Sequence, residues 1–442
     1  MSKQKVNVFW FKRDLRIEDN RALFACFNNS EKFIPIFIFN PSILQSFSNL
    51  LFDPRLKFIL NIVEELRRKI KLYVFFEEDE KVFEKLIEKF EISKVFTSKP
   101  LTQSGINRVR KIEKFLSLKG IELIQILDNV LVDYEKIPFK KIFTHFYNEW
   151  KSKVDEKMIS DPDYNVKTLF DDFLEIETQK VISFIQEKIK NFGLYWDYEF
   201  GLDRIKNYDF SKYDILRNSL AEDGSSKLSP YIRFGVFSIR KIYQISKNKS
   251  ESFVKELAWR EFWYHIYHYF NDFVDLEFQE RRRNIEWENN EKLIEAFFEA
   301  KTGYPIVDAA IIQLKTEKWM HNRARLIVGS FFTKHLLSSW MIGEKFFSEH
   351  LLDYDEIVNI GNWQWVASVG PDPRPLRIFN PILQSQKFDP NALYIKKYLP
   401  ELSKIEPEKL HNPIKHKIPY YQPIVNHYEV LEKIRKRFYV EK

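Results

Sequence analysis

One short segment of the sequence carries side chains that could bind a flat heterocycle. Helical spacing places Glu256, Trp259, Arg260 and Trp263 on one face, at positions i, i+3, i+4 and i+7. Two indoles can stack on a ring while the carboxylate forms a hydrogen bond with its edge. The same spacing also fits a core-facing tryptophan pair beside a solvated Glu–Arg pair, so the segment alone leaves both interpretations open.

A second helical segment combines an indole, an amide and two guanidinium groups. Asn322 lies one turn from Trp319 and from Arg325, and its amide offers both a donor and an acceptor, which matches the edge of a base. Arg323 and Arg325 can bind phosphates or a carboxylate. The neighbouring His321 is more typical of a structural histidine than of a catalytic base.

Two acids follow at close spacing. Asp353 and Asp355 could bind a metal ion or ribose hydroxyls, and they could equally cap a helix. No His or Cys of this segment completes a set of metal ligands, so the sequence predicts no metal site.

A possible anion site precedes another predicted helix. The segment Gly224–Tyr231 supplies hydroxyls and backbone N–H groups just before the helix begins, where an anion could bind. Any helix N-cap has a similar composition, so this signal is weak by itself.

The first 130 residues alternate between short apolar runs and helical patterns such as Arg55–Ile70 and Lys81–Phe90. The predicted strands are Val6–Phe11, Phe33–Phe39, Leu72–Phe76, Val95–Thr97 and Ile121–Leu127. This alternation is typical of a doubly wound parallel sheet, which binds ligands at the carboxyl ends of its strands. The chain contains neither a G-x-G-x-x-G nor a G-x-x-x-x-G-K motif, which disfavours an ordinary dinucleotide or ATP site.

The rest of the chain is predicted to be helical. Residues 131–194 are interpreted as a connector, with a helical stretch around Phe139–Lys157. From residue 195 onward, patterns of 3.6-residue period are separated by Gly and Pro. With 442 residues, the chain is too long for one ordinary domain. We therefore predict an α/β domain over 1–130 and an all-helical domain over 195–442.

Composition narrows the classes of function. The net charge of +7 permits a polyanionic partner without requiring one. Seven of the ten tryptophans follow residue 250, which suggests base stacking or electron transfer: Trp259, Trp263, Trp287, Trp319, Trp340, Trp363 and Trp365. The single cysteine, Cys26, excludes an intramolecular disulfide and a Cys-based metal site, and we expect a cytoplasmic protein. We expect no secretory signal and no membrane span.

The order of the motifs resembles the photolyase/cryptochrome family over almost the whole chain. The similarity includes the opening strand and turn, Phe9–Arg16. The further motifs, in order, are Glu256–Trp263, Lys301–Ala309, Trp319–Arg325, Asn359–Trp365 and Arg377–Pro381. The resemblance implies an N-terminal antenna-binding domain and a helical domain that binds FAD. It also implies a second chromophore, which could be a folate, a deazaflavin or a flavin.

The resemblance implies roles for individual residues around FAD. Asn359 is expected to face the flavin N5, and Arg325 to pair with Asp353 beside the ring system. The residues expected to hold the cofactor are Tyr213, Ser225, Ser226, Lys227, Leu228, Ser229, Phe253, Arg325, Asp353, Tyr354, Asp355 and Asn359. Trp363, Trp340 and Trp287 match a chain of tryptophans that relays an electron to the flavin.

The resemblance also implies a pocket for a flipped pyrimidine dimer and a DNA-contacting surface. Glu256, Trp259, Asn322 and Trp365 match the pocket, with Glu256 and Asn322 acting on the lesion. The full set of expected DNA-binding residues is Arg217, Glu256, Trp259, Arg260, Trp263, Asn322, Arg323, Trp365 and Arg377. Four positions depart from the family pattern: Ser225 stands where Thr is usual, Trp263 where Tyr or Phe is usual, Leu326 where dimer-specific enzymes commonly have Met, and Asn362 where Gly is usual.

The function implied is light-driven electron transfer from reduced FAD that splits cyclobutane pyrimidine dimers in DNA, by a monomeric protein. The main alternative is a cryptochrome-type blue-light photoreceptor without repair activity. Repair of six-four photoproducts and a DNA-binding flavoprotein without photochemistry are further alternatives. The family's six-four enzymes place histidines near the position of Asn322, which favours the cyclobutane lesion.

Overall fold

The computed structural model describes residues 3–46, 53–222, 224–374 and 376–438. The chain forms two compact units that interleave along the sequence. The first unit comprises the chain up to Asp133, together with Ser152–Tyr208 and Lys227–Lys249. The second comprises Tyr134–Lys151, Asp209–Ser226 and the chain from Ser250 onward.

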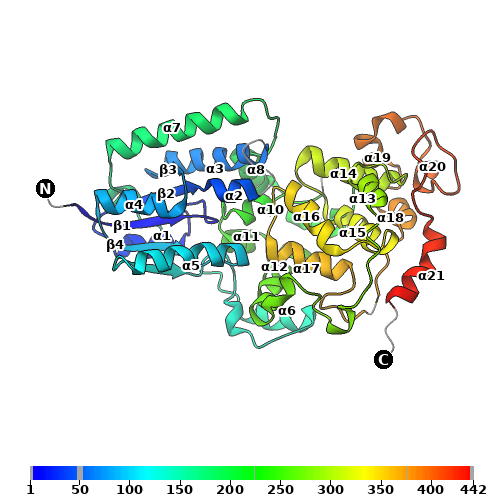
Figure 1. Cartoon of the computed structure of the whole chain (residues 1–442), viewed down its shortest axis with the longest axis horizontal. Helices are drawn as coiled ribbons and strands as arrows, with labels where there is room; N and C mark the ends of the chain where they lie inside the picture. The colour runs from blue at the N-terminus through cyan, green and yellow to red at the C-terminus, as the bar shows by residue number, and fades with distance from the viewer. Residues whose placement is uncertain (1–2, 47–52, 223, 375, 439–442) are drawn as a thin grey trace. The chain divides into compact units, whose positions relative to one another are not determined.

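The first unit is built on a parallel sheet (Figure 1). Among the described residues, five strands pair in the order β3-β2-β1-β4-β5. Their bounds are β1 Lys5–Phe11, β2 Phe33–Phe39, β3 Tyr73–Phe76, β4 Glu91–Ser98 and β5 Glu122–Ile126. The five predicted strands and the doubly wound fold are confirmed, although β4 begins four residues earlier than predicted.

Helices cover both faces of this sheet, which explains why its central strands are continuously apolar. Every residue of β2 is buried, and so are six of the seven residues of β1. Helices α4 and α5 pack on Val8 and Trp10 of β1, whereas α1 contacts β1, β4 and β5. The helices of this part are α1 Arg21–Asn28, α2 Pro41–Ser46, α3 Arg55–Lys69, α4 Asp79–Lys89, α5 Gln103–Ser117 and α7 Asp172–Ile189.

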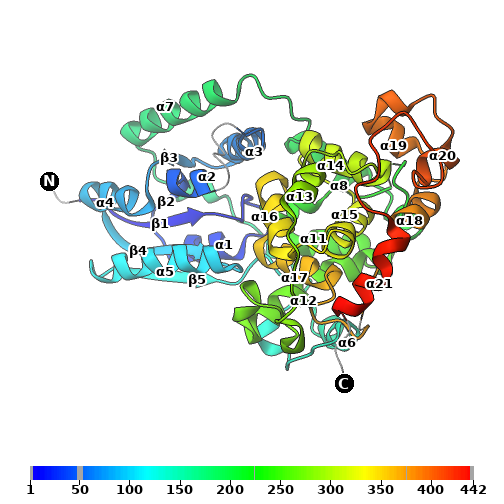
Figure 2. The same cartoon turned by 45° about the vertical axis from the view of Figure 1, so that its right-hand side comes forward.

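The edge strand β3 is covered by α7, which lies beside it in Figures 1 and 2. The hydroxyl of Thr178 on α7 accepts a hydrogen bond from the backbone N–H of Val74 at 2.9 Å. This contact satisfies a donor that an exposed edge strand would offer to another chain.

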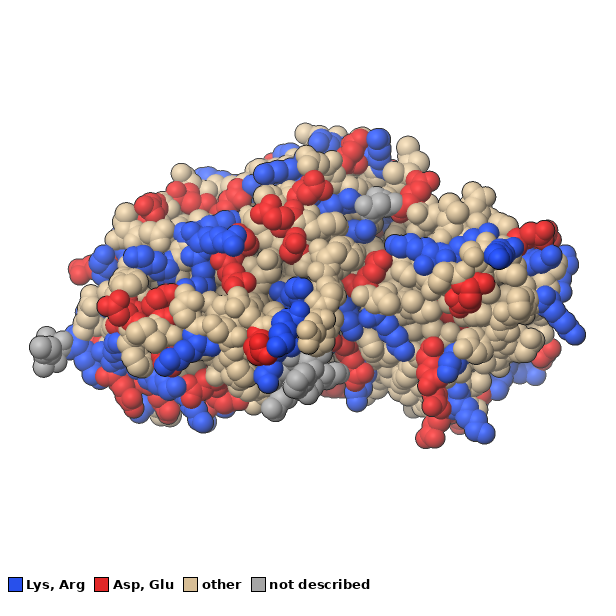
Figure 3. Space-filling view, turned by 90° about the horizontal axis from the view of Figure 1, so that it is seen from above, with Lys and Arg blue, Asp and Glu red and all other residues tan. Residues whose placement is uncertain are grey.

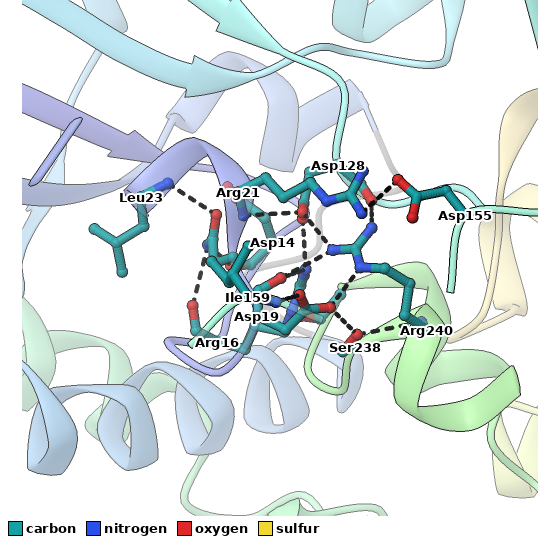
Figure 4. A network of polar contacts seen from close by, with 12 residues as sticks. Asp14, Arg16, Asp19, Arg21, Leu23, Asp128, Asp155, Ile159, Ser238 and Arg240 are labelled. Atoms are coloured by element: carbon teal, nitrogen blue, oxygen red, sulfur yellow. Dashed lines mark hydrogen bonds and ion pairs between the residues drawn. The ribbon is translucent and has the colours of Figure 1, made fainter. Parts of the chain in front are cut away.

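A buried network of charges ties a distant segment to the sheet (Figure 4). Arg240, on α11, donates to Asp19 at 2.5 Å and to Asp128 at 2.9 Å, and Arg16 donates to Asp128 at 2.6 Å. Ser238 also donates to Asp19. All five residues are at most 4% exposed, so each charge depends on its partners for compensation.

This network explains why the compact units differ from the predicted domain boundaries. The first unit also contains α8 Tyr198–Asn207, α10 Ser229–Arg233 and α11 Ile239–Ser246, which the sequence analysis grouped with the helical domain. The helix pattern was interpreted correctly, but helical periodicity does not reveal which core a helix joins. As a functional division, 1–130, 131–194 and 195–442 stays a prediction.

The second unit is helical in its described residues. Its longest helix, α12, spans Glu251–Tyr269 and is capped by Ser250, whose hydroxyl accepts from the N–H of Phe253 at 3.1 Å. The helices are α6 Phe143–Ser152, α9 Tyr213–Leu216, α12, α13 Glu291–Phe298, α14 Pro305–Glu317, α15 Asn322–Ser330, α16 Trp340–His350, α17 Glu356–Val366, α18 Pro381–Phe388, α19 Leu393–Tyr398, α20 Pro407–His411 and α21 His427–Phe438. Nowhere in residues 3–46, 53–222, 224–374 and 376–438 is a helix long and apolar enough to cross a membrane.

Candidate functional site

An arginine–aspartate pair joins α15 to the segment before α17. Arg325 donates through Nη2 to both carboxylate oxygens of Asp353, at 3.0 and 2.8 Å, and through Nε to the carbonyl of Met320 at 2.9 Å. Asp353 is 9% exposed, whereas the side chain of Arg325 is partly exposed, so the pair lies at the edge of the interior. The Arg325–Asp353 pair expected from the resemblance is confirmed.

Asp355 caps the helix that follows it. Its carboxylate accepts from the N–H of Val358 at 3.4 Å and from the hydroxyl of Tyr264 at 2.8 Å. The capping role that the sequence left open is therefore present.

A glutamate that the sequence analysis missed holds Asn359 and Tyr354. Glu344, on α16, accepts from the side-chain amide of Asn359 at 3.1 Å and from the hydroxyl of Tyr354 at 2.9 Å. Burial raises the pKa of Glu344, and the bonds from Asn359 and Tyr354 oppose that rise. Because the amide nitrogen of Asn359 is engaged, its oxygen is the group left to accept from a ligand. Glu344 belongs to no motif that could have identified it.

The side chains expected to meet a flipped base lie along α12. Glu256 is half-buried and accepts from the guanidinium of Arg217. Trp259 stacks on Phe143 of α6, with ring centroids 3.7 Å apart and planes inclined by 4°. One face of this indole is therefore supported by a second aromatic ring, which sequence spacing did not indicate.

Trp263 lies below the surface. It is 1% exposed, and its ring lies so close to Gly361 on α17 that a Cβ there would approach it to 2.3 Å. Its expected role in DNA contact stays a prediction, and burial means that the ring has no exposed face to offer a strand in this structure. Trp263 supports Trp259, whose ring centroid is 5.7 Å away.

The electrostatics of Glu256 distinguish it from an ordinary surface glutamate. Burial raises the pKa of its carboxyl, and the nearby guanidinium groups of Arg217 and Arg323 oppose that rise. A raised pKa favours the neutral acid, which can donate a hydrogen bond to a carbonyl oxygen.

The remaining residues expected to contact DNA have partners in the protein. Arg323 donates to the side chain of Asn218 at 2.6 Å and lies 4.2 Å from the ring centre of Phe388. Arg377 pairs with Asp372 and lies 4.3 Å above Trp365.

Two more of them lie at helix surfaces. Asn322 is exposed at the first residue of α15, and Arg260 lies 5.0 Å from the ring of Tyr264. A DNA role for these residues stays a prediction.

The expected pyrophosphate-binding residues divide between the compact units. Tyr213 and Phe253 meet edge to face at 5.2 Å in the second unit, which also contains Ser225 and Ser226. Lys227, Leu228 and Ser229 belong to the first unit. Gly224 precedes them so close to Leu216 that a Cβ would lie 2.5 Å from the leucine side chain. The role of the segment stays a prediction.

The three tryptophans expected to relay an electron lie on segments that neighbour one another in space. A Cβ on Gly343 would approach the ring of Trp363 to 2.3 Å, and Trp340 lies one turn before Gly343 on α16. The segment of Trp287 is held beside the start of α16, because Glu288 and Leu337 share a backbone hydrogen bond of 2.7 Å. Trp363 is 3% and Trp340 1% exposed, whereas Trp287 is only half-buried. The series therefore runs from the interior toward the surface.

The donors and acceptors of the second unit fit the edge of a flavin. They comprise a guanidinium–carboxylate pair, a capping carboxylate and an oriented amide, contributed by Arg325, Asp353, Asp355 and Asn359. A flavin requires such fixed partners at its ring nitrogens and carbonyls, because the protein tunes the cofactor through them.

Comparison with known proteins agrees with this arrangement. The family model described as DNA photolyase matches residues 7–163, and the one described as FAD binding domain of DNA photolyase matches residues 253–439. A deoxyribodipyrimidine photo-lyase of Synechococcus is 33% identical and aligns with 95% of this chain and 93% of its own length.

Two solved structures share the fold. An archaeal photolyase from Sulfolobus tokodaii, solved with two FAD molecules, has a TM-score of 0.87 at 33% identity and covers 98% of this chain and 99% of its own. A cryptochrome from Synechocystis has a TM-score of 0.83 at 24% identity, with 99% of each chain covered, and shows the fold alone. Because the Synechococcus relative exceeds 30% identity over nearly its entire length and both family models match, this chain belongs to the DNA photolyase family.

Proposed function

We propose that this protein is a light-dependent DNA lyase that splits cyclobutane pyrimidine dimers. The observation that carries the proposal is the arrangement of α12. It presents a half-buried acid with a raised pKa, Glu256, one helical turn from an indole stacked on a second ring, Trp259 on Phe143. The tryptophan series and the flavin-type donor set occupy the same compact unit. Membership of the DNA photolyase family supports the same conclusion.

The acid and the indole have separate tasks. A dimer within a duplex must leave the base stack before it can react, and photolyases are a known case of such base flipping. Trp259 offers the extruded bases a ring to stack on, which is worth about 1–3 kcal/mol per base. Glu256, held by Arg217, donates a hydrogen bond to the carbonyl on which negative charge develops. Bound FAD supplies, once reduced and excited by light, the electron that opens the cyclobutane ring.

Contacts with DNA phosphates are proposed for Arg217, Arg323 and Arg377. The face of the molecule drawn in Figure 3 mixes Lys and Arg with Asp and Glu over most of its area, in keeping with a net charge of only +7. Overall charge therefore does not locate the DNA. Arg377 already pairs with Asp372. To contact a phosphate, Arg377 must therefore release Asp372 and bind the phosphate in its place.

Cyclobutane dimers are proposed over six-four photoproducts because the structure offers no free histidine acid in this part of α15. His321 is 4% exposed, and its Nδ1 accepts a hydrogen bond from the N–H of Arg323 at 3.1 Å as the cap of α15. Its neighbour Asn322, at the pocket position, cannot donate a catalytic proton.

Two defined oligonucleotides test the proposed function and its alternatives. One contains a single cyclobutane dimer and the other a single six-four photoproduct, and each is irradiated with the protein after chemical reduction of its flavin. We expect restored bases only from the first. A photoreceptor without repair activity would restore neither, and repair of the six-four product would overturn the choice of lesion.

A second flavin is proposed as the antenna chromophore. The support is the Sulfolobus photolyase, which contains two FAD molecules and is 33% identical to this chain. In the first unit, strand order reverses beside β1, where Lys12 donates to the carbonyl of Ser98 at 3.1 Å. Burial lowers the pKa of Lys12 to about 7. Denaturation and chromatography should release two flavins per chain, and one flavin with a folate or deazaflavin would refute this choice.

A monomer located in the cytoplasm is also proposed. The support is the one cysteine of the sequence, Cys26, which is buried and forms no disulfide. Light scattering at working concentration should give a mass near 53.5 kDa, and a mass near twice that value would contradict the monomer.

A further inference from the structure

The middle tryptophan of the proposed relay has a hydrogen-bond partner that distinguishes it from the inner one. The indole N–H of Trp340 donates to a carboxylate oxygen of Glu277 at 3.2 Å. Trp340 is 1% exposed and Glu277 is 7% exposed. The indole N–H of Trp363 is also buried, but it has no hydrogen-bond partner within the described part of the chain.

The carboxylate of Glu277 is not part of an ion pair in the described part of the chain. Among the described residues, no Lys or Arg forms an ion pair with its carboxylate, and the nearby Arg283 donates to its backbone carbonyl instead, at 3.0 Å. A buried carboxylate without a cation is costly, because desolvation is not offset by attraction. A positive charge formed on the neighbouring indole would provide that attraction.

An indole that has lost an electron needs what Glu277 supplies. The oxidised ring carries a positive charge, and its N–H becomes a much stronger acid than in the neutral ring. A carboxylate at hydrogen-bond distance favours the charged form of its partner and can accept the proton. A neutral acceptor would still satisfy the N–H of resting Trp340, although with a weaker hydrogen bond, and the charge of Glu277 matters most when the ring is oxidised.

We propose that Glu277 draws the electron vacancy outward from Trp363 to Trp340 and accepts the proton of oxidised Trp340. This inference rests on the proposed relay and therefore on the proposed function. One electron leaves Trp340 for oxidised Trp363, and the proton on Nε1 moves to Glu277, which leaves a neutral indole radical beside a neutral acid. The initial oxidant is light-excited oxidised flavin, which acts through Trp363.

The second half of the step restores Trp340. Trp287 gives up one electron, Glu277 returns the proton to Nε1, and the vacancy then resides at the half-buried Trp287. An added thiol refills it and is itself oxidised. Because a carboxylate stabilises the vacancy at Trp340 and no described residue contacts the indole N–H of Trp363, return of the vacancy to Trp363 becomes unfavourable.

The substitution Glu277→Gln tests the proposal, because it keeps an acceptor of similar shape and removes the charge. With oxidised FAD bound and thiol present, photoreduction should slow about tenfold, which is the difference between a hydrogen bond to a charged group and one to a neutral group. Flash spectroscopy should show that the tryptophan radical stays cationic instead of becoming neutral. Glu277→Asp, which keeps the charge, should restore part of the rate.

Glu280→Gln is the matched control, since it removes an exposed carboxylate three residues away and should photoreduce as the unaltered protein does. In the dark, UV resonance Raman spectra should show a weakened indole N–H hydrogen bond in Glu277→Gln. The band of Trp340 is identified by its loss in Trp340→Phe. This signature does not depend on photochemistry.

Several results would overturn the proposal. One is photoreduction of Glu277→Gln within about twofold of the unaltered protein, with the neutral radical forming at the same rate. If that variant does not retain FAD, the test moves to the unaltered protein, in which the rate of radical deprotonation is measured in H2O and in D2O. Equal rates in the two solvents would exclude the proton transfer. Undiminished photoreduction in Trp363→Phe would overturn the relay itself, and the inference with it, but would leave repair by chemically reduced FAD intact.

Discussion

Asp128 in the first compact unit and two glutamates in the second show opposite shifts of carboxyl pKa. In the first unit, Asp128 lies between two guanidinium groups, and although burial raises its pKa, Arg16 and Arg240 hold that pKa below the usual value. In the second unit, burial raises the pKa of Glu256 and of Glu344, and their partners only oppose the rise.

This difference separates an architectural role from a chemical one. A fully paired carboxylate stays charged and fixes the chain, whereas a carboxyl group with a raised pKa holds its proton to higher pH than an ordinary glutamate. Groups of the second kind are typical of functional sites. The comparison predicts that substitutions in the network around Asp128 mainly affect stability and that those around Glu256 mainly affect binding and repair.

The largest expected effect is on stability, from Arg240→Ala. It removes one partner of a buried network and leaves Asp19 and Asp128 undercompensated, which should cost about 3–5 kcal/mol of unfolding free energy. Chemical denaturation followed by circular dichroism measures the loss. Lys241→Ala on the same helix breaks an exposed pair with Glu18 and should cost at most about 1 kcal/mol. Equal costs would refute the architectural role of the network.

The next effect is on lesion binding, from Trp259→Ala. Loss of stacking should weaken binding of dimer-containing DNA by about 1–3 kcal/mol, or about 5- to 150-fold in Kd. The flavin spectrum and the unfolding free energy serve as controls for folding. Phe143→Ala, which removes only the supporting ring, should weaken binding less than Trp259→Ala. Unchanged binding in Trp259→Ala would exclude this indole as the stacking platform.

Glu256→Gln should separate binding from chemistry. The variant should still bind damaged DNA but repair with lower quantum yield, because the amide is a weaker donor to a developing negative charge than a carboxylic acid. Burial raises the pKa of Glu256, so repair that requires the neutral acid should decline as pH rises through that pKa. Quantum yield measured against pH should show this decline in the unaltered protein and a flat profile in the variant. The same decline of quantum yield in the unaltered protein and in Glu256→Gln would mean that a group other than Glu256 causes it.

The smallest effect is expected from Arg377→Ala. The logarithm of DNA affinity should fall with the logarithm of salt concentration by about 0.9 per phosphate neutralised, and the variant should make that slope shallower by about one unit. Binding isotherms at several salt concentrations provide the slope. An unchanged slope would mean that Arg377 stays paired with Asp372 and does not contact a phosphate.

The sequence by itself determined the elements and the family. Short apolar runs predicted all five strands, and that of the central strand β2 is unbroken because both faces of a parallel sheet are buried there. The order of the motifs predicted the Arg325–Asp353 pair, and the two family models match both halves of the chain. These features depend on periodicity and on residue identity, which a sequence displays directly.

Tertiary structure alone decided which distant groups meet. Glu277 lies 63 residues from Trp340, and Asp128 lies 112 residues from Arg240, so no local pattern joins either pair. Helical spacing placed Trp263 on the same face as Trp259, but only the packing of α17 shows that Gly361 covers it. Periodicity identifies the face of a helix that must be covered, whereas the packing of other elements determines what covers it and which buried charges find partners.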